Sequence, residues 1–487
     1  MRVIDLAIVV VYLIGITLFG ARFRRSQKDL KTYFLGGRTA PWWAIALSIV
    51  SAETSTLTII GTPALAFGGN LGFLQLVLGY LVARVVIVLL FLPHYFRGEM
   101  YTAYELMRRR FGERLRRATA VTFLITRALA EGVRVFAISI VISIVLGTGE
   151  VASIALITAL TLFYTFEGGM TAVIWTDVVQ MVIYVTGAVV SFFVILNHIP
   201  GGWEHVVASA APLGKFQVFD FQFALSSEFF STTYTFWAGL LGGCFLTTAS
   251  HGTDQLMVQR LLAARSQGQS AVSLLSSWIV IFCQFLLFLL IGVSLYVFYT
   301  DANLPPPHPP DRLYPQFIWT YLPVGVAGLV IAAILAAAMA NIAAALNSLA
   351  ATTVVDLYKP LLGPAAETKS DRFYLRLARG VTIFWGLVLL GIGILARQWG
   401  SVLEAGLAIA SIPFGALLGV FLLGVLTRRV GERDALVGMF AGLAAITFVR
   451  FGTSIAWTWY VLIGTSVTFC AAWVAALLSG RKVEEIR

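Results

Sequence analysis

The sequence predicts an all-α protein that crosses a membrane many times. Of its 487 residues, 59% are hydrophobic and only 12% are charged, and the mean hydropathy is +0.87. Apolar stretches recur along the whole chain, and crossing the hydrocarbon core of a bilayer takes about 20 such residues. The three cysteines fall inside these stretches, where they are expected to pack and not to form a disulfide framework. We therefore predict a single transmembrane domain over residues 1–487.

About thirteen segments have the length and composition of membrane-spanning helices. Only the loops at 199–231 and 300–320 are sizeable extramembrane pieces on their side of the membrane. The predicted segments cover approximately residues 3–20, 41–67, 71–93, 119–147, 150–166, 174–198, 232–252, 271–299, 321–350, 378–397, 401–427, 434–450 and 456–479.

The positions of the basic residues agree with this division into membrane segments and loops. Lys and Arg concentrate in cytoplasmic loops, and most of the 34 in this chain fall in alternate loops, at 21–40, 94–118, 253–270 and 351–377. This predicts a multi-pass cell-membrane protein with its N-terminus outside and its C-terminus in the cytoplasm. The net charge of +10 then reflects topology and contact with an anionic inner leaflet, so we expect the bilayer as a partner and no nucleic acid. No obligate protein partner is evident.

The second segment is interrupted by a polar run, Ser-Ala-Glu-Thr-Ser-Thr-Leu-Thr at 51–58, followed directly by Gly61-Thr62-Pro63. In hydrocarbon, a broken and hydroxyl-rich helix persists only where protein or an aqueous cavity lines it. The run contains Glu53, and a charge at this depth costs about 2.5–3.5 kcal/mol even on permissive insertion scales. A functional carboxylate is the favoured interpretation of Glu53, with a paired or snorkelling structural carboxylate as the alternative.

The seventh segment is interrupted in a similar way. Three glycines, Gly239, Gly242 and Gly243, lead into a polar run that ends near His251. Because the two interrupted segments are five spans apart, they cross the membrane in opposite directions, as the first helices of inverted repeats do. We predict a first repeat over residues 41–198 and a second over 232–427. A glycine-rich packing helix is the alternative for the seventh segment.

Hydroxyl side chains at the two interruptions are candidate solute ligands. Ser55 and Thr58 lie about one turn apart in the second segment, and we expect them to face Thr247 and Ser250 of the seventh segment across a cavity.

The fourth segment suggests the charge of the solute. Its Arg127, Glu131 and Arg134 are spaced by four and three residues, so they share one helix face. Arg127 and Glu131 can pair within the helix, which leaves Arg134 near the middle of the membrane without an obvious local partner. A guanidinium in a dry cavity matches a carboxylate, so we favour an anionic organic solute. The alternatives are a structural triad bridged by Glu131, or pairing of Glu53 with Arg134 or with the intramembrane Arg84.

Several motifs together resemble the sodium/solute symporter family, which includes sodium-coupled proline, sugar, iodide and monocarboxylate carriers. The resemblance extends in order over nearly the whole chain. It implies a LeuT-like fold with a 5+5 inverted repeat, one extra helix before it and two after it. The motifs are Gly61-Thr62-Pro63, Tyr164 to Gln180, Asp254 to Arg260, Ala332 to Met339, Asp356 to Lys359 and Gly415 to Gly424.

The resemblance also implies where a sodium ion would bind. The family supplies backbone carbonyls that match Ser51, Thr54 and Ala337, in line with the preference of hard cations for oxygen. The family's pair of hydroxyl residues is replaced here by Ala340-Asn341. Asn341 offers one side-chain oxygen in their place.

Two further carboxylates bear on the coupling ion. Asp177 matches a family carboxylate on the inward route of the ion, although a helix-capping role is an equal alternative. Glu53 can supply charge to a rebuilt cation site, or it can carry a proton in place of sodium. Sodium is favoured as the coupling ion because the carbonyl-supplying interruption is intact, and a proton is the alternative. No other cofactor is expected.

Other classes of function fit less well. The five histidines are not spaced as a helical metal pair, and no phosphate-binding glycine loop is present, so an enzyme is not expected. A channel would show a repeated pore motif or rings of like charge. We predict a secondary transporter that symports a cation and a small organic solute by alternating access. An uncoupled carrier or a substrate sensor without flux is the alternative.

Overall fold

The computed structural model describes residues 2–22, 38–97, 103–164, 170–362, 369 and 371–479. The first half of the chain forms α1 (Val3–Arg22), α3 (Trp42–Glu53), α4 (Thr56–Gly68), α5 (Leu74–Val86), η3 (Ile87–Phe91), α6 (Leu92–Tyr95), α7 (Ala103–Phe111), α8 (Glu113–Leu146), α9 (Glu150–Tyr164), α10 (Met170–His198), α11 (Gly202–Ala210) and α12 (Ser227–Ser231). The second half forms η4 (Ala238–Gly242), α13 (Gly243–Gly252), α14 (Gln255–Leu262), α15 (Gln267–Asp301), η5 (Pro310–Arg312), α16 (Leu313–Tyr321), α17 (Val326–Ala351), η6 (Thr352–Tyr358), α18 (Lys359–Leu362), α19 (Asp371–Ala396), α20 (Val402–Leu426), α21 (Glu432–Gly452), η8 (Trp457–Trp459) and α22 (Tyr460–Leu478).

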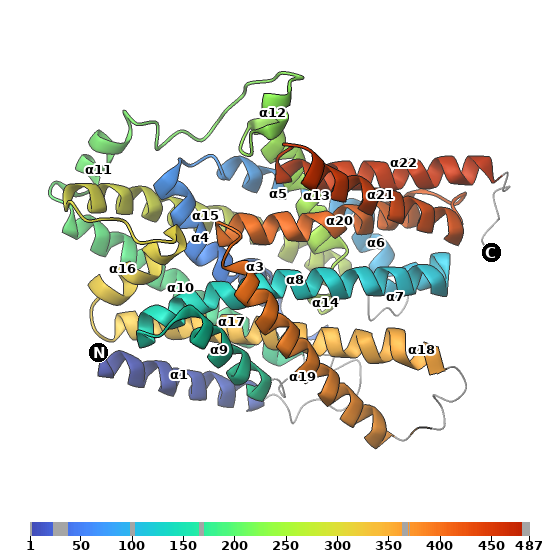
Figure 1. Cartoon of the computed structure of the whole chain (residues 1–487), viewed down its shortest axis with the longest axis horizontal. Helices are drawn as coiled ribbons and strands as arrows, with labels where there is room; N and C mark the ends of the chain where they lie inside the picture. Colours follow the sequence, from blue (N-terminus) through green and yellow to red (C-terminus); the bar gives the residue numbers. More distant parts are fainter. Residues whose placement is uncertain are drawn as a thin grey trace.

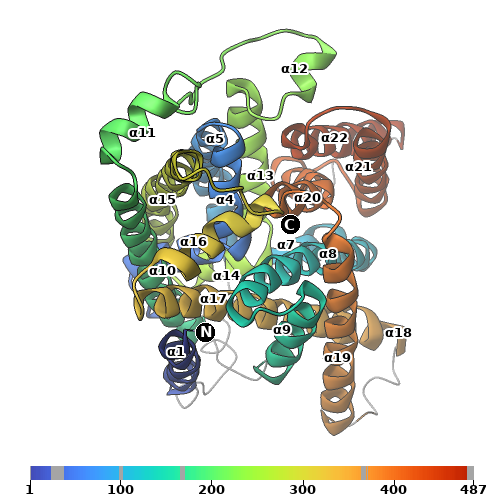
Figure 2. The ribbon, with the colours of Figure 1, turned by 60° about the vertical axis from the view of Figure 1, so that its left-hand side comes forward.

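Long helices run side by side along one axis, with α1 at one edge and α21 and α22 at another (Figure 1). Seen after rotation, α4, α5, α8, α10, α13, α15, α17 and α20 form the centre of the bundle, and α1, α19, α21 and α22 lie outside it (Figure 2). Within the described ranges, nine helices are long and apolar enough to cross a membrane, and the bent pair α3 and α4 makes a tenth span. The other three predicted segments are also helical, as α1, α9 and η4 with α13, but they are shorter. The all-α polytopic fold is therefore confirmed.

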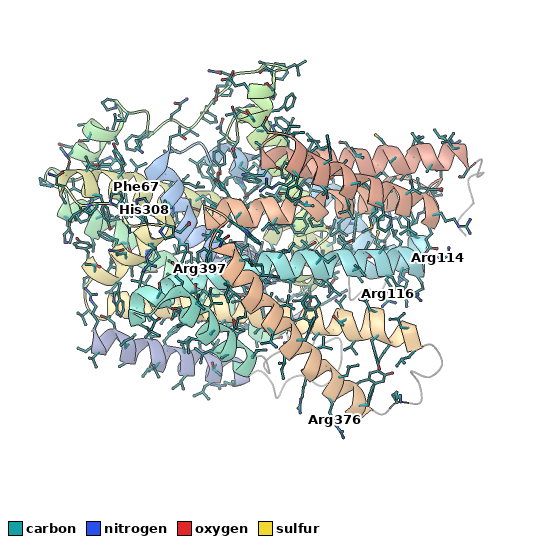
Figure 3. The ribbon with its side chains drawn as sticks, in the orientation of Figure 1. Phe67, Arg114, Arg116, His308, Arg376 and Arg397 are labelled. Carbon is teal, nitrogen blue, oxygen red and sulfur yellow. The ribbon has the colours of Figure 1, made fainter. Side chains whose placement is uncertain are left out.

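The two ends of the bundle differ in charge. Arg114, Arg116 and Arg376 lie at one end, which we call the basic end, and Phe67 and His308 lie toward the other (Figure 3). Glu432 of α21 accepts hydrogen bonds from the backbone N–H groups of Arg114, at 2.6 Å, and Leu115, at 3.3 Å. The basic residues predicted within 23–37 and 480–487 lie outside the described residues, as does the 165–169 part of the Tyr164 to Gln180 motif.

The predicted interruption of the second segment falls inside its polar run. Helix α3 ends at Glu53, α4 begins at Thr56, and the two halves are bent by 64°. Gly61, Thr62 and Pro63 do not break the segment as expected, because they lie within α4. Gly61 instead allows a close approach, since a Cβ there would lie 2.6 Å from the Cβ of Leu403 on α20.

The interruption of the seventh segment lies later than its glycines suggest. The chain leaves the helix at Thr253 and resumes α14 after Asp254, whose Oδ1 accepts the N–H of Leu256 at 2.8 Å. The glycines belong to helical turns that pack closely on α5, and a Cβ at Gly243 would lie 2.3 Å from the carbonyl oxygen of Leu76. The glycines of this segment therefore serve packing, and its break follows the polar run.

Two buried aspartates fix helix ends that bound the site. Asp5 accepts the N–H groups of Gly325 and Gly328 at 2.7 and 2.8 Å, which holds α1 against the beginning of α17. Asp311 accepts the N–H of Val402 at 3.2 Å and so caps α20. Burial raises the pKa of the Asp311 carboxyl to about 6, which is the direction that desolvation imposes on an acid.

Candidate functional site

A cavity of about 190 Å³ lies where the two broken helices meet. Its wall comes from α3, α4, α5, α8, α13, α14, α15, α17 and α20. Apolar rings and aliphatic groups provide most of the surface, as in typical small-molecule sites, and a minority of polar groups is distributed among them. The polar and charged lining residues are Glu53, Ser55, Thr58, Tyr80, Thr126, Arg127, Arg134, Thr247, Ser250, His251, Asp254, Arg260 and Asn341.

All four predicted hydroxyl ligands line this one cavity. Ser55 and Thr58 reach it from the break between α3 and α4, and Thr247 and Ser250 reach it from α13. Ser250 also contacts the Nδ1 of His251, at 2.9 Å. The two interruptions thus supply polar groups to the same space, which fits a solute site formed between discontinuous helices.

Glu53 is held by basic partners on both sides. Arg84 of α5 donates from Nη2 to Glu53 Oε2 at 2.6 Å, and its side chain is fully buried. His251 approaches the same oxygen with Nε2 at 3.3 Å. Arg84 also donates to Ser277 Oγ and to the backbone oxygen of Tyr80, each at 3.2 Å. Pairing of Glu53 with Arg84, one of the sequence alternatives, is what the structure contains.

The expectation that Arg134 lacks a local partner is wrong. Glu131 pairs with both arginines of its helix face, with Arg134 through Oε1 and with Arg127 at 3.1 Å. A one-turn spacing in either direction places both guanidinium groups within reach of the same carboxylate. Asp254 lies 3.7 Å from Arg127 and shares its charge. The Nε of Arg134 has no hydrogen-bond partner among the described residues.

The charges that touch the cavity are unequal. Its wall contains three guanidinium groups, from Arg127, Arg134 and Arg260, and two carboxylates, from Glu53 and Asp254. Glu131 is fully buried behind the wall. Each of the three guanidinium groups is already paired with a carboxylate, Arg127 and Arg134 with Glu131 and Arg260 with Asp177. The side chain of Arg134 is about a quarter exposed, so it is paired and still accessible.

The residues that the resemblance implies for sodium are not all brought together. The break places Ser51 and Thr54 next to each other, and within the described chain no backbone N–H is recorded donating to the carbonyl oxygen of either. Ala337 lies inside the regular helix α17, and Asn341, one turn later, lines the cavity. Helix α17 packs on α1, α8, α10 and α19 and touches α4 only marginally. No hydrogen bond of the described residues joins Asn341 to Ser51 or Thr54.

Asp177 is tied to two other helices. Its Oδ2 accepts hydrogen bonds from Ser48 of α3 at 2.6 Å and from Arg260 of α14 at 2.9 Å, and Arg260 also donates to Ser48 at 3.0 Å. The helix-capping alternative is wrong, because α10 begins at Met170 and Asp177 lies about two turns inside it. Arg260, which the sequence placed in a loop, is a buried residue of α14.

Aromatic side chains that the sequence pattern did not single out also contribute to the cavity wall, from the start of α5 and from α15. Phe73 stacks on Phe285 with ring centroids 5.0 Å apart, and Tyr234 lies 5.7 Å from Phe73. Tyr234 donates to Glu404 of α20 at 2.7 Å. Single aromatic residues in apolar segments are common, so only their convergence in space distinguishes these from other core residues.

Known proteins with similar sequences belong to the family that the motifs resemble. The Sodium:solute symporter family matches residues 33–442. The chain is 30% identical to the sodium/iodide cotransporter of Homo sapiens over 451 residues, covering 91% of this chain and 68% of that protein. It is 28% identical to the sodium/sialic acid symporter NanT of Aliivibrio fischeri over 480 residues, covering 96% and 91%.

A solved structure shows the same architecture. A sodium-coupled sialic acid symporter, determined in a substrate-bound outward-open state, superposes with a TM-score of 0.83 at 27% identity and covers 98% of both chains. This agreement confirms the LeuT-like fold that the resemblance implied.

Proposed function

The chain belongs to the sodium:solute symporter family, and we propose that it couples sodium to the uptake of a small carboxylate-bearing solute bound in the cavity between its two broken helices. It is a multi-pass membrane transporter and not an enzyme. Members of the family are sodium-coupled symporters of small solutes. The observation that carries the choice of solute is the accessible guanidinium group of Arg134 in a wall that also contains the four predicted hydroxyl ligands.

Arg134 is the proposed partner of the solute carboxylate. Glu131 already has Arg127 as a second partner, so Arg134 can turn donors toward a solute without leaving that carboxylate unpaired. The planar fork of a guanidinium binds a carboxylate through two parallel hydrogen bonds. The hydroxyls of Ser55, Thr58 and Thr247 would orient the rest of the molecule, which favours a carboxylic acid with hydroxyl groups.

The named substrates of relatives provide a starting panel. Relatives carry iodide or sialic acid, and others carry monocarboxylates. Radiolabelled sialic acid, lactate and iodide, offered to purified protein in lipid vesicles, test the class of solute. We expect a carboxylate to be taken up and iodide to be ignored. Uptake of iodide alone would contradict the proposed class, and binding without flux would identify a sensor.

The proposed sodium site uses the carbonyl oxygens of Ser51, Thr54 and Ala337 and the side-chain oxygen of Asn341. Because α17 packs mainly on α1, α8, α10 and α19 in this structure, α3 would approach α17 when the ion binds. Asp177 would take part only on the inward route, after Arg260 releases it. The proton alternative requires Glu53 to exchange protons, and its bond of 2.6 Å to Arg84 opposes that.

The proposed topology places the basic end in the cytoplasm, with the N-terminus outside. Residues 41–198 and 232–427 would form the two inverted repeats, each beginning with a broken helix, α3 with α4 and α13 with α14. In the proposed alternating-access cycle, the stacked rings of Phe73 and Phe285 would close one side of the cavity while the α14 side opens, and would separate when the α14 side closes.

Removing one hydroxyl from each broken helix should weaken solute binding without unfolding the protein. Thr58→Val and Thr247→Val keep the shape of the side chain and delete a hydrogen bond, which contributes about 1 kcal/mol, or about fivefold in affinity. Equilibrium binding of the radiolabelled carboxylate measures the change for each variant.

The matched control is Thr158→Val on α9. Thr158 is buried and its hydroxyl donates to the carbonyl of Ile154, away from the cavity. Solute affinity should be unchanged in this variant. If the two cavity variants instead lose thermal stability and keep wild-type affinity, Thr58 and Thr247 serve helix packing and not the solute.

A further inference from the structure

An extended segment with exposed apolar side chains lies between α11 and α12. Residues 217–225, which we call the strap, contain no helix. In both views this part of the chain runs along the margin of the bundle, clear of the long helices (Figure 1, Figure 2). A row of large apolar side chains open to the surroundings marks an interaction surface. The row consists of Phe219, Phe221, Phe223 and Leu225, which are 45%, 62%, 64% and 83% exposed.

The backbone of the strap is attached to the beginning of α5. The N–H of Asp220 donates to Gln75 Oε1 at 2.9 Å, and Gln75 Nε2 donates to the carbonyl of Tyr234 at 3.1 Å. The carbonyl of Asp220 accepts the N–H of Phe236 at 2.7 Å. The ring of Tyr234 in turn lies 5.7 Å from that of Phe73, which lines the solute cavity. The strap is therefore fixed to the cavity wall by its backbone, while its apolar side chains stay exposed.

The exposed rings continue the apolar surface of the seventh predicted membrane segment. The ring of Phe221 lies 4.9 Å from that of Phe236, and the ring of Phe223 lies 5.7 Å from that of Trp237. Trp237, directly before η4, and Leu241 within η4 are exposed as well. Exposed apolar side chains on a membrane segment face lipid, and Trp is enriched where the bilayer meets water. The strap thus extends a surface that already contacts the bilayer.

The chemistry of the strap matches the headgroup region of a bilayer. Asp220 is its only charged residue. Among the described residues, the backbone N–H groups of Phe221, Phe223 and Leu225 have no recorded partner. Unpaired backbone groups exclude the hydrocarbon core, where water is absent, but the headgroup region supplies water to them. Apolar side chains can at the same time reach the acyl boundary from there.

We propose that the strap is a lipid-binding element that lies in the headgroup region, with its four apolar side chains directed to the acyl chains. The leaflet is the one opposite the basic end, because Lys215, just before the strap, donates to the carbonyl of Phe67 at 2.6 Å, and Phe67 lies toward that end (Figure 3). Lipid contact would hold the strap, and through Gln75 and Tyr234 it would steady the cavity wall.

A second copy of the chain is the other candidate partner for this surface. A stable interface between proteins takes about 20–30 residues on each side, whereas the strap offers a single row of four large apolar side chains. The continuity with Trp237 and Leu241 also favours lipid. The proposal depends neither on the identity of the solute nor on the coupling ion.

The test measures the depth of the strap in vesicles of phosphatidylcholine. The full-length protein, with its three cysteines replaced by alanine, receives a nitroxide label through Phe221→Cys or Phe223→Cys. Both positions are exposed, so the label should not disturb folding. Electron paramagnetic resonance then compares collisions with oxygen, which concentrates in the bilayer, and with a nickel chelate, which stays in water.

Two control positions calibrate this ratio. Leu241→Cys labels the exposed face of η4, and Ala302→Cys labels an exposed position in the loop after α15. At both strap positions the ratio of oxygen to nickel collisions should be several-fold higher than at Ala302→Cys and should approach that at Leu241→Cys. Strap ratios equal to the Ala302→Cys ratio would overturn the proposal. A defined distance between the strap labels of two protein copies would also overturn it, in favour of a dimer contact.

Discussion

Replacing Arg134 with alanine should abolish binding of the carboxylate solute and leave the folded protein in the membrane. The solute would lose its bidentate partner in a water-poor cavity. The protein should tolerate the change because Glu131 keeps Arg127 at 3.1 Å and is not left as an unpaired buried charge. Arg134→Lys should retain partial binding, since the point charge survives and the fork does not. Equilibrium binding of the radiolabelled carboxylate gives both values.

Arg397→Ala is a suitable control for this experiment. Arg397 is also ion-paired, to Glu150 at 2.8 Å, but it lies outside the cavity. This variant should bind the solute normally. Unchanged solute affinity in Arg134→Ala would remove Arg134 from the site, and a neutral sugar as the transported solute would count against the proposed class as a whole.

Arg84→Ala should have the largest effect on stability. Arg84 is completely buried and its bond to Glu53 is 2.6 Å long, so its loss leaves a buried carboxylate with only His251 at 3.3 Å. Breaking a buried ion pair from one side typically costs about 3–5 kcal/mol. The midpoint of thermal unfolding in detergent should fall accordingly.

A second substitution separates charge from packing. In the double variant Arg84→Met with Glu53→Gln, both charges are removed together, so much of the lost stability should return. If Arg84→Ala is as stable as the unmodified protein, the Glu53 carboxylate does not depend on Arg84. It would then be free to exchange a proton.

The sequence was sufficient for the fold because hydrophobic length and a polar interruption are local signals. The polar run at 51–58 contains the break at Thr54 and Ser55, and the four hydroxyl residues predicted as solute ligands line one cavity. The second break was placed less well, because glycines signal close packing as readily as interruption. Gly243 packs against Leu76, while the helix ends after Gly252.

Pairing of charges was the part that the sequence could not determine. The spacing of Arg127, Glu131 and Arg134 is equally compatible with one ion pair or with a shared carboxylate, and the structure contains the shared form. Ion pairs between residues that are distant in the sequence are even harder to predict from it. Arg260 meets Asp177 across 83 positions of the chain, and this contact exists because α3 packs against both α10 and α14. Such contacts follow from topology and not from any local pattern.

Uptake into proteoliposomes under imposed gradients tests the central claim most directly. With pH held constant, an inward sodium gradient should accelerate uptake of the radiolabelled carboxylate, and Asn341→Ala should remove that acceleration. Glu53→Gln, which keeps a hydrogen-bonding group beside Arg84, should still respond to sodium. The account is contradicted if uptake ignores sodium, follows an imposed pH gradient, and becomes uncoupled from that gradient in Glu53→Gln.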